Sequence, residues 1–146
     1  GMIIRRILMI GGVVAAATLA STAHAQLIFS DNFNDEVGRL NVGAVGVNPL
    51  LRWTVTKGTV DVVPVGTQFD VYPGNGHYLD LDGSNGRVGG IRTNQIFNLA
   101  PGDYTLSFDL GKYTNPVETM TFGLTGGVFS QSYSSGTGIF PSLVNQ

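Results

Sequence analysis

The stretch DYTLSFDLG, residues 103–111, decides the fold because its side chains alternate between apolar and polar. The apolar set, which we expect to be buried, is Tyr104, Leu106, Phe108 and Leu110, and the polar set is Thr105, Ser107 and Asp109. A period of two residues is the pattern of a β-strand with one buried face. The stretch ETMTFGLTG, residues 118–126, repeats the pattern with Met120, Phe122 and Leu124. We therefore predict two strands that share one core.

Further short apolar runs are separated by Gly, Pro, Asn and Asp, and no sustained helical period follows residue 26. The additional predicted strands are QLIFSDNF (26–33), RWTVTKG (52–58), TVDVVPV (59–65), GHYLDLDG (76–83), GGIRTNQIFNL (89–99) and GVFSQSYS (127–134). The runs at 52–58 and 59–65 are predicted to pair with each other by turning at Lys57 and Gly58. Many short strands with turn signals between them indicate an antiparallel β-sandwich.

The N-terminal residues have the pattern of a secretory signal peptide. Arg5 and Arg6 precede the apolar run ILMIGGVVAAATLA, and Ala23 and Ala25 form an Ala-x-Ala cleavage pattern. We predict that residues 1–25 are removed by the general secretory route and that 26–146 form a single domain, secreted or at the cell surface of a bacterium. A retained anchor helix is the alternative, although the apolar run is short for a membrane span. Gly1, in front of Met2, is interpreted as an expression-vector remnant.

The composition of residues 26–146 limits the chemistry. These residues carry six basic and ten acidic side chains, a net charge of −4, which argues against a nucleic-acid partner. The chain has no cysteine, no Gly-x-Ser-x-Gly motif and only one histidine after the leader, His77. We therefore expect no enzyme and no cofactor. A hydrolase stays open as an alternative and would need two facing carboxylates.

Asp80 and Asp82, in HYLDLDGSNG (77–86), raise the question of calcium. An EF-hand loop that began at Asp80 would need Gly and Glu at the positions of Asn85 and Ile91, so no EF-hand is predicted. A structural calcium site of another type, which would use one of these acids, remains an alternative. We expect Asp80 on a polar sheet face and Asp82 as the cap of the following turn, since an Asp side chain can accept amide hydrogens two residues on.

Aromatic side chains beside a glycine turn indicate where a ligand would bind. Sugars stack on exposed aromatic rings and take hydrogen bonds from nearby polar groups. Tyr78 is expected to share the polar face of Asp80, whereas Trp53 is expected in the core. The candidate ligand-binding residues are Tyr72, His77, Tyr78, Asp80, Arg92 and Asn94.

Several pieces of the chain carry a family likeness: Asp31-Asn32-Phe33, Trp53, 58–62, 73–76, 78–84 and 104–111. Together they resemble a group of uncharacterised bacterial exported proteins, many of which end in a PEP-CTERM sorting signal. That group is similar to galactose-binding-like jelly rolls, which implies a jelly-roll sandwich and association with carbohydrate or matrix. It implies no catalytic residue. Members continue beyond the position of Ser130 with more strands, so we expect this chain to lack the last strands of its relatives.

These observations favour a non-catalytic, secreted surface or extracellular-matrix protein that associates with polysaccharide. A purely structural or adhesive module without a small ligand is the alternative. No membrane span is expected in residues 26–146, and the sequence leaves the oligomeric state open.

Overall fold

The computed structural model describes residues 2–11, 26–43, 50–112, 119–125, 129–134 and 144–145. Its strands are β1 (Met2–Gly11), β2 (Gln26–Asp31), β3 (Arg39–Gly43), β4 (Trp53–Lys57), β5 (Thr59–Val63), β6 (Tyr78–Asp80), β7 (Gly90–Thr93), β8 (Tyr104–Lys112), β9 (Thr119–Leu124), β10 (Phe129–Ser134) and β11 (Val144–Asn145). All their pairings are antiparallel, and the described residues contain no helix. The prediction of an all-β antiparallel fold is confirmed, and the arrangement is consistent with a β-sandwich.

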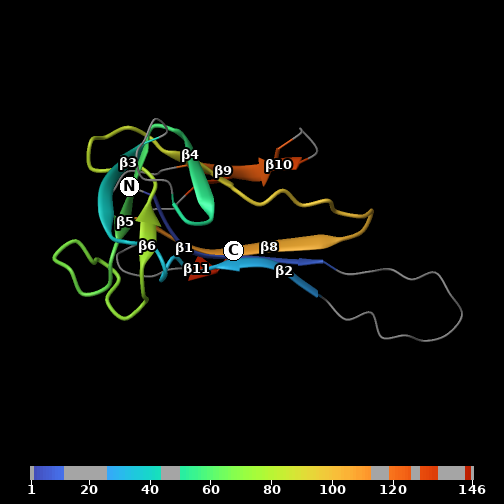
Figure 1. Ribbon diagram of the computed structural model, residues 1–146, viewed down its shortest axis with the longest axis horizontal. Coiled ribbons are helices and arrows are strands. Elements are labelled where there is room, and N and C mark those ends of the chain that lie inside the picture. The colour runs from blue at the N-terminus through green and yellow to red at the C-terminus, as the bar shows by residue number, and fades with distance from the viewer. Residues whose placement is uncertain are drawn as a thin grey trace, which may run out of the picture.

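One large sheet organises the molecule (Figure 1). Its strand order is β11-β8-β1-β6-β5-β3, and β2 also pairs with β1. Long strands β1, β2 and β8 lie side by side, and the sheet curls away from them through β6, β5 and β3. Two small sheets, β9–β10 and β4–β7, complete the described part of the chain.

Strand β1 is central to the large sheet. One edge of β1 pairs with β8, and its other edge pairs with β6 near the start of the strand and with β2 near its end. Ile3, Ile4, Ile7 and Met9 of this strand are buried. The same residues lie in the predicted leader. In the full chain they supply a strand, and their removal on export stays a prediction, because the proposed cleavage residues Ala23 and Ala25 lie outside the described part.

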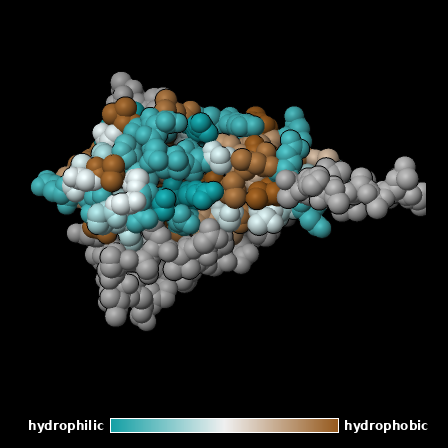
Figure 2. Space-filling view, turned by 90° about the horizontal axis from the view of Figure 1, so that it is seen from below, coloured by the Kyte–Doolittle hydropathy of each residue, from teal (hydrophilic) through white to brown (hydrophobic). Residues whose placement is uncertain are grey.

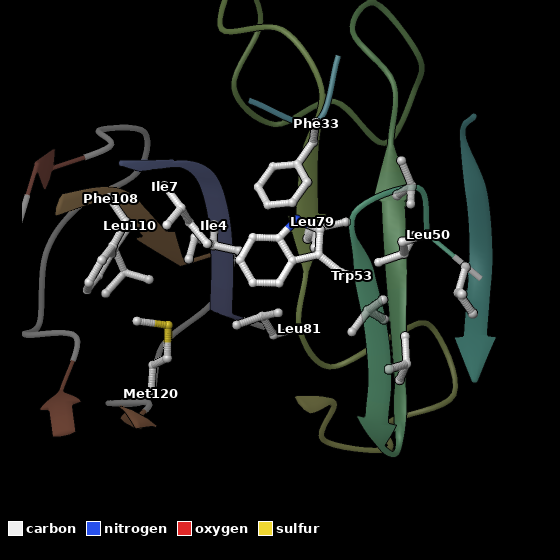
Figure 3. Packing of buried hydrophobic residues seen from close by; sticks show 14 of the residues in the cluster. Ile4, Ile7, Phe33, Leu50, Trp53, Leu79, Leu81, Phe108, Leu110 and Met120 are labelled. Carbon is white, nitrogen blue, oxygen red and sulfur yellow. The ribbon is translucent and has the colours of Figure 1, made fainter. Parts of the chain in front are cut away.

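The core is centred on Trp53, whose burial was predicted (Figure 3). Its ring lies 5.5 Å from that of Phe29 and 6.0 Å from that of Phe33, centroid to centroid. The indole Nε1 donates a hydrogen bond of 2.7 Å to Oδ2 of Asp31, so the one polar atom of the ring is satisfied inside the core. This pairing stabilises burial of the whole side chain.

The predicted faces of β8 and β9 are found in the structure, except at the strand ends. Phe108 is only 2% exposed, and Leu110 and Met120 are buried with it in the main core cluster. Leu106 and Phe122 are half-buried and pack against that cluster. Tyr104, the first residue of β8, is 36% exposed, so its predicted burial is wrong. Leu124, the last residue of β9, is 42% exposed and also lies outside the core.

The predicted pairing of 52–58 with 59–65 is wrong. Strand β4 pairs with β7, whereas β5 pairs with β3 and β6 in the large sheet. Gly58, between them, has a φ of +54°, and a Cβ at this position would lie 2.1 Å from the carbonyl oxygen of Val88. The chain therefore does not turn back in a hairpin at Gly58, where the 87–88 backbone approaches closely, but passes from one sheet to the other.

Candidate functional site

The structure places the two candidate tyrosines in the interior. Tyr78 is 1% exposed and Tyr72 is also buried, with their ring centroids 5.8 Å apart. The Tyr78 hydroxyl accepts a hydrogen bond from Val71 N (2.8 Å) and donates one to Phe69 O (3.1 Å). Burial raises the pKa of Tyr78 to about 12, so the phenol stays neutral. Neither ring is available as a surface on which a sugar could stack.

The expectation that Tyr78 shares a polar, exposed face with Asp80 is therefore wrong. Strand β6 lies between β1 and β5 in the curled sheet. A second apolar cluster of Ile3, Val63, Tyr72 and Tyr78 covers the face of β6 that we expected to be wet. Alternation along one strand cannot distinguish a sheet that is covered on one side from a sheet that is covered on both.

His77 immediately precedes β6 and Asp80 is its last residue, and both are half-buried. The backbone N of His77 donates to Asn34 Oδ1 at 2.9 Å, and its ring Nδ1 lies 3.2 Å from the carbonyl oxygen of Glu36. Asp80 Oδ1 accepts a hydrogen bond from Asp82 N at 3.1 Å, so Asp80 makes an Asx turn here. The predicted cap by Asp82 stays a prediction. Burial raises the pKa of Asp80, and the hydrogen bond from Asp82 opposes that shift.

Arg92 and Asn94 lie in a different sheet, in and just after β7, and both are exposed. Arg92 stands opposite Thr54 in the β4–β7 ladder. Asn94 N donates to Arg52 O at 2.8 Å, and Thr54 Oγ1 donates to Asn94 Oδ1 at 2.5 Å. The six candidate residues thus divide into a group around β6 and a group at β7.

A surface groove of about 440 Å³ lies beside the second group. It is lined by part of β2, by the residues that lead into β4 and by those that follow β7: Leu27, Ile28, Phe29, Ser30, Leu51, Arg52, Asn94 and Gln95. Leu27 and Leu51 are exposed there, next to a guanidinium and two amides. Asn94 is the one sequence-predicted site residue in this lining.

Hydrogen bonds join the walls of the groove. Arg52 Nη1 donates to Ser30 O at 2.9 Å and so links the start of β4 to β2. The amide of Asn94 reaches back to Leu51 O, with Nδ2 at 3.4 Å from that oxygen. These contacts restrain the side chains of Arg52 and Asn94. Restraint of a binding side chain lowers the entropic cost of binding a ligand.

Two buried carboxylates lie next to residues that line the groove: Glu36 is hydrogen-bonded to Leu51, and Asp31 follows Ser30 in the chain. Glu36 is 4% exposed, and its Oε1 accepts a hydrogen bond of 2.7 Å from Leu51 N. Its Oε2 has no hydrogen-bond partner among the described residues. Desolvation by burial raises the pKa of Glu36, and the negative charge of Asp31 adds to that shift. Asp31 is engaged through Oδ1 with Phe33 N (2.9 Å) and through Oδ2 with Trp53.

Sequence reasoning missed Arg52, Gln95 and Glu36. The groove joins three segments that are far apart in the chain, so no local pattern marks it. Within the described ranges, no group of three or more His, Cys, Asp or Glu lies close enough together to hold a metal ion. The same residues include no helix that is both long and apolar enough to cross a bilayer.

Figure 2 shows one face of the molecule, on which hydrophilic residues predominate left of the centre in the upper part and a group of apolar residues lies right of the centre. No known family model, curated protein or solved structure matches the chain. The groove and the buried carboxylates are therefore interpreted from their chemistry alone.

Proposed function

We propose that this chain is an exported, non-catalytic protein of a bacterial surface or extracellular matrix, and that it binds polysaccharide in the groove between β2, β4 and β7. The observation that carries this proposal is the lining of the groove. Leu27 and Leu51 offer apolar surface for the C–H faces of a sugar, and Arg52, Asn94 and Gln95 offer hydrogen-bonding groups for its hydroxyls.

Two further observations support this function. The Ala-x-Ala leader pattern supports export, and the resemblance to PEP-CTERM-associated proteins supports a surface or matrix location and a galactose-binding-like jelly roll. Among the described residues, the groove lining contains no carboxylate, whereas a glycan hydrolase would need a facing pair. A hydrolase is consequently the least supported alternative.

A purely structural or adhesive module is the second candidate, and one observation favours it. Tyr72, Tyr78 and Trp53 are all buried, so none of these rings is an exposed platform for a sugar. Binding by the groove would then depend on hydrogen bonds and aliphatic contacts, which predicts modest affinity.

A glycan array with the full-length protein tests the proposal, followed by titration of the best polysaccharide. Arg52→Ala and Gln95→Ala should each weaken binding about tenfold, because a lost hydrogen bond to a ligand is worth about 1–1.5 kcal/mol. Arg92→Ala is the matched control, since Arg92 is exposed on the same strand pair but does not line the groove. No binding to any bacterial or plant polysaccharide would favour the structural module instead.

A further inference from the structure

The groove between β2, β4 and β7 has a positive charge that no acid of its lining balances. Of the described residues that line it, Arg52 alone is charged, and the polar ones beside it, Ser30, Asn94 and Gln95, are neutral. An arginine side chain keeps its charge across the physiological pH range. The groove therefore offers a permanent cation beside the exposed apolar side chains of Leu27 and Leu51.

Part of the Arg52 guanidinium is free to bind a ligand. Its Nη1 donates to Ser30 O at 2.9 Å, and within the described ranges the guanidinium makes no other hydrogen bond and no ion pair. The bond to Ser30 restrains the group and leaves the edge formed by Nε and Nη2 unoccupied by those residues. Two N–H groups side by side on a guanidinium match the two oxygens of a carboxylate.

The two amides of the groove differ in their free hydrogen-bonding capacity. Asn94 already contacts the chain through both ends of its amide, since Oδ1 accepts from Thr54 Oγ1 at 2.5 Å and Nδ2 lies 3.4 Å from Leu51 O. Gln95 is exposed, and its hydrogen bond to the described part of the chain uses its backbone oxygen, which accepts from Thr93 Oγ1 at 2.9 Å. Its side-chain amide is therefore available for a sugar hydroxyl.

A second arginine adds to the positive charge of this face. Asn94 N donates to Arg52 O, and Thr54 lies opposite Arg92 in the ladder, so the side chains at these four positions share one face of the β4–β7 pair. Arg52 and Arg92 are diagonal neighbours, about 7–8 Å apart. None of the four residues is acidic, so this face is locally positive although residues 26–146 carry a net charge of −4.

We propose that the groove selects an acidic polysaccharide, one whose sugars carry a carboxylate as uronic acids do, and that Arg52 binds this carboxylate. The inference rests on the polysaccharide binding proposed above and names the class of polymer. Leu27 and Leu51 contact the C–H face of the same sugar, and the Gln95 amide binds a hydroxyl. A charge-assisted, bidentate contact is stronger than a hydrogen bond to a neutral hydroxyl, so acidic polymers bind more tightly than neutral ones.

Calorimetric titration of the full-length protein with matched polymers tests the selection. Polygalacturonate, polymannuronate and hyaluronan are each compared with their carboxyl-reduced forms, in which the linkages and ring stereochemistry are kept and the charge is removed. At least one acidic polymer should bind about tenfold or more tightly than its reduced form, because a hydrogen bond to a charged group is worth more than one between neutral groups.

Substitutions locate the selection at Arg52. Arg52→Gln should bind the two forms of the selected polymer with equal affinity. Arg52→Lys keeps the charge but not the planar edge, so it should retain only part of the preference. Arg92→Gln is the matched control, because it removes an equal charge from the same face outside the groove lining, and it should change the preference about threefold or less. Urea titration of each variant checks that it is folded.

The outcomes separate this inference from the proposed function. A parent protein that binds reduced and acidic polymers equally, or binds only neutral ones on the glycan array, overturns the acidic selection and leaves polysaccharide binding in place. A preference that survives in Arg52→Gln and is lost in Arg92→Gln overturns the role of Arg52. Failure to bind any polysaccharide overturns the proposed function, and the inference with it.

Discussion

At the scale of single residues, Asp31 and Glu36 connect the core to the groove. Asp31 holds the Trp53 indole and, through an Asx hydrogen bond to Phe33 N, fixes Phe33 at a φ of 60° with its ring buried. Glu36 holds the backbone of Leu51, which lines the groove. Substitutions of these two acids should therefore affect stability and groove geometry together.

Phe108 is the residue for which burial predicts the largest loss. Phe108→Ala should lower the free energy of unfolding of the full chain by about 3–5 kcal/mol, because it leaves a cavity beside Phe122, whose ring centroid lies 5.0 Å away. Urea titration measures this loss. Leu124→Ala, at an exposed position in β9, is the control and should cost about 0.5 kcal/mol or less. Equal losses in the two variants would show that β8 does not face the core.

Glu36 predicts a dependence of stability on pH. Its pKa in the folded protein is raised above the ordinary value of 4.5, so folding favours the protonated carboxyl. Its contribution to stability is therefore present in full below pH 4.5 and is lost as the pH rises through the folded pKa. Relative to the parent, Glu36→Gln should become more stable as the pH increases across that window.

Urea titrations of parent and variant between acid and neutral pH check this expectation. Asp35→Asn, a change at the exposed acid next to Glu36, serves as the control and should leave the pH dependence of the parent in place. A Glu36→Gln variant whose stability difference from the parent does not change with pH would contradict the raised pKa.

At the scale of elements, the existence of most strands could be predicted from sequence, although β1, β3 and β11 were not predicted as strands. The pairing partners of the strands could not be predicted. Alternation and turn residues marked β2, β4, β5, β6, β8 and β9 because these signals act over a few neighbouring residues. Whether β4 turned back onto β5 depended on the contact of Gly58 with the distant 87–88 backbone. The second face of β6 is likewise covered by a cluster that includes Ile3 and Val63, which no local pattern reveals. Tyr78 was therefore predicted on an exposed face, whereas it is buried.

The candidate site shows the same limit. Asn94 was predicted as a ligand-binding residue, and it does line the groove. Arg52 and Gln95 carry no local signal, since their role arises only when β2 and the ends of β4 and β7 come together. Glu36 lies between β2 and β3, and no local signal marks its burial, because a carboxylate is rarely buried unless it is hydrogen-bonded.

Gly58 predicts a sharp cost at the junction of β4 and β5. Gly58→Ala places a Cβ against Val88 O in addition to the left-handed backbone, which alone costs about 1–2 kcal/mol for a residue with a Cβ. Gly86→Ala is the matched control, because Gly86 has a φ of +69° but open space around its Cβ position. Thermal unfolding should show a clearly larger loss for Gly58→Ala; equal losses would mean that the 87–88 backbone is not in contact.

At the scale of the whole molecule, no disulfide holds the sheets together, and we expect no metal to do so. The midpoint of thermal unfolding should be the same in calcium as in chelator, since no calcium loop was predicted and the described residues bring no three candidate ligands together. Differential scanning calorimetry of the full chain tests this. A midpoint that rises sharply with calcium, and loses that rise in Asp82→Ala or Asp80→Ala, would restore the calcium site.

The ladder between β1 and β8 is the longest in the large sheet, with nine paired positions. Hydrogen exchange of the β8 amides measures this ladder most directly. In the full chain, the amides of residues 104–112 that pair with β1 should exchange slowly, at rates set by opening of the sheet. Ile7→Asp, which disrupts the buried face of β1, should accelerate their exchange strongly. Exchange of these amides in the parent at the rate of an unstructured chain would contradict the central position of β1 in the sheet.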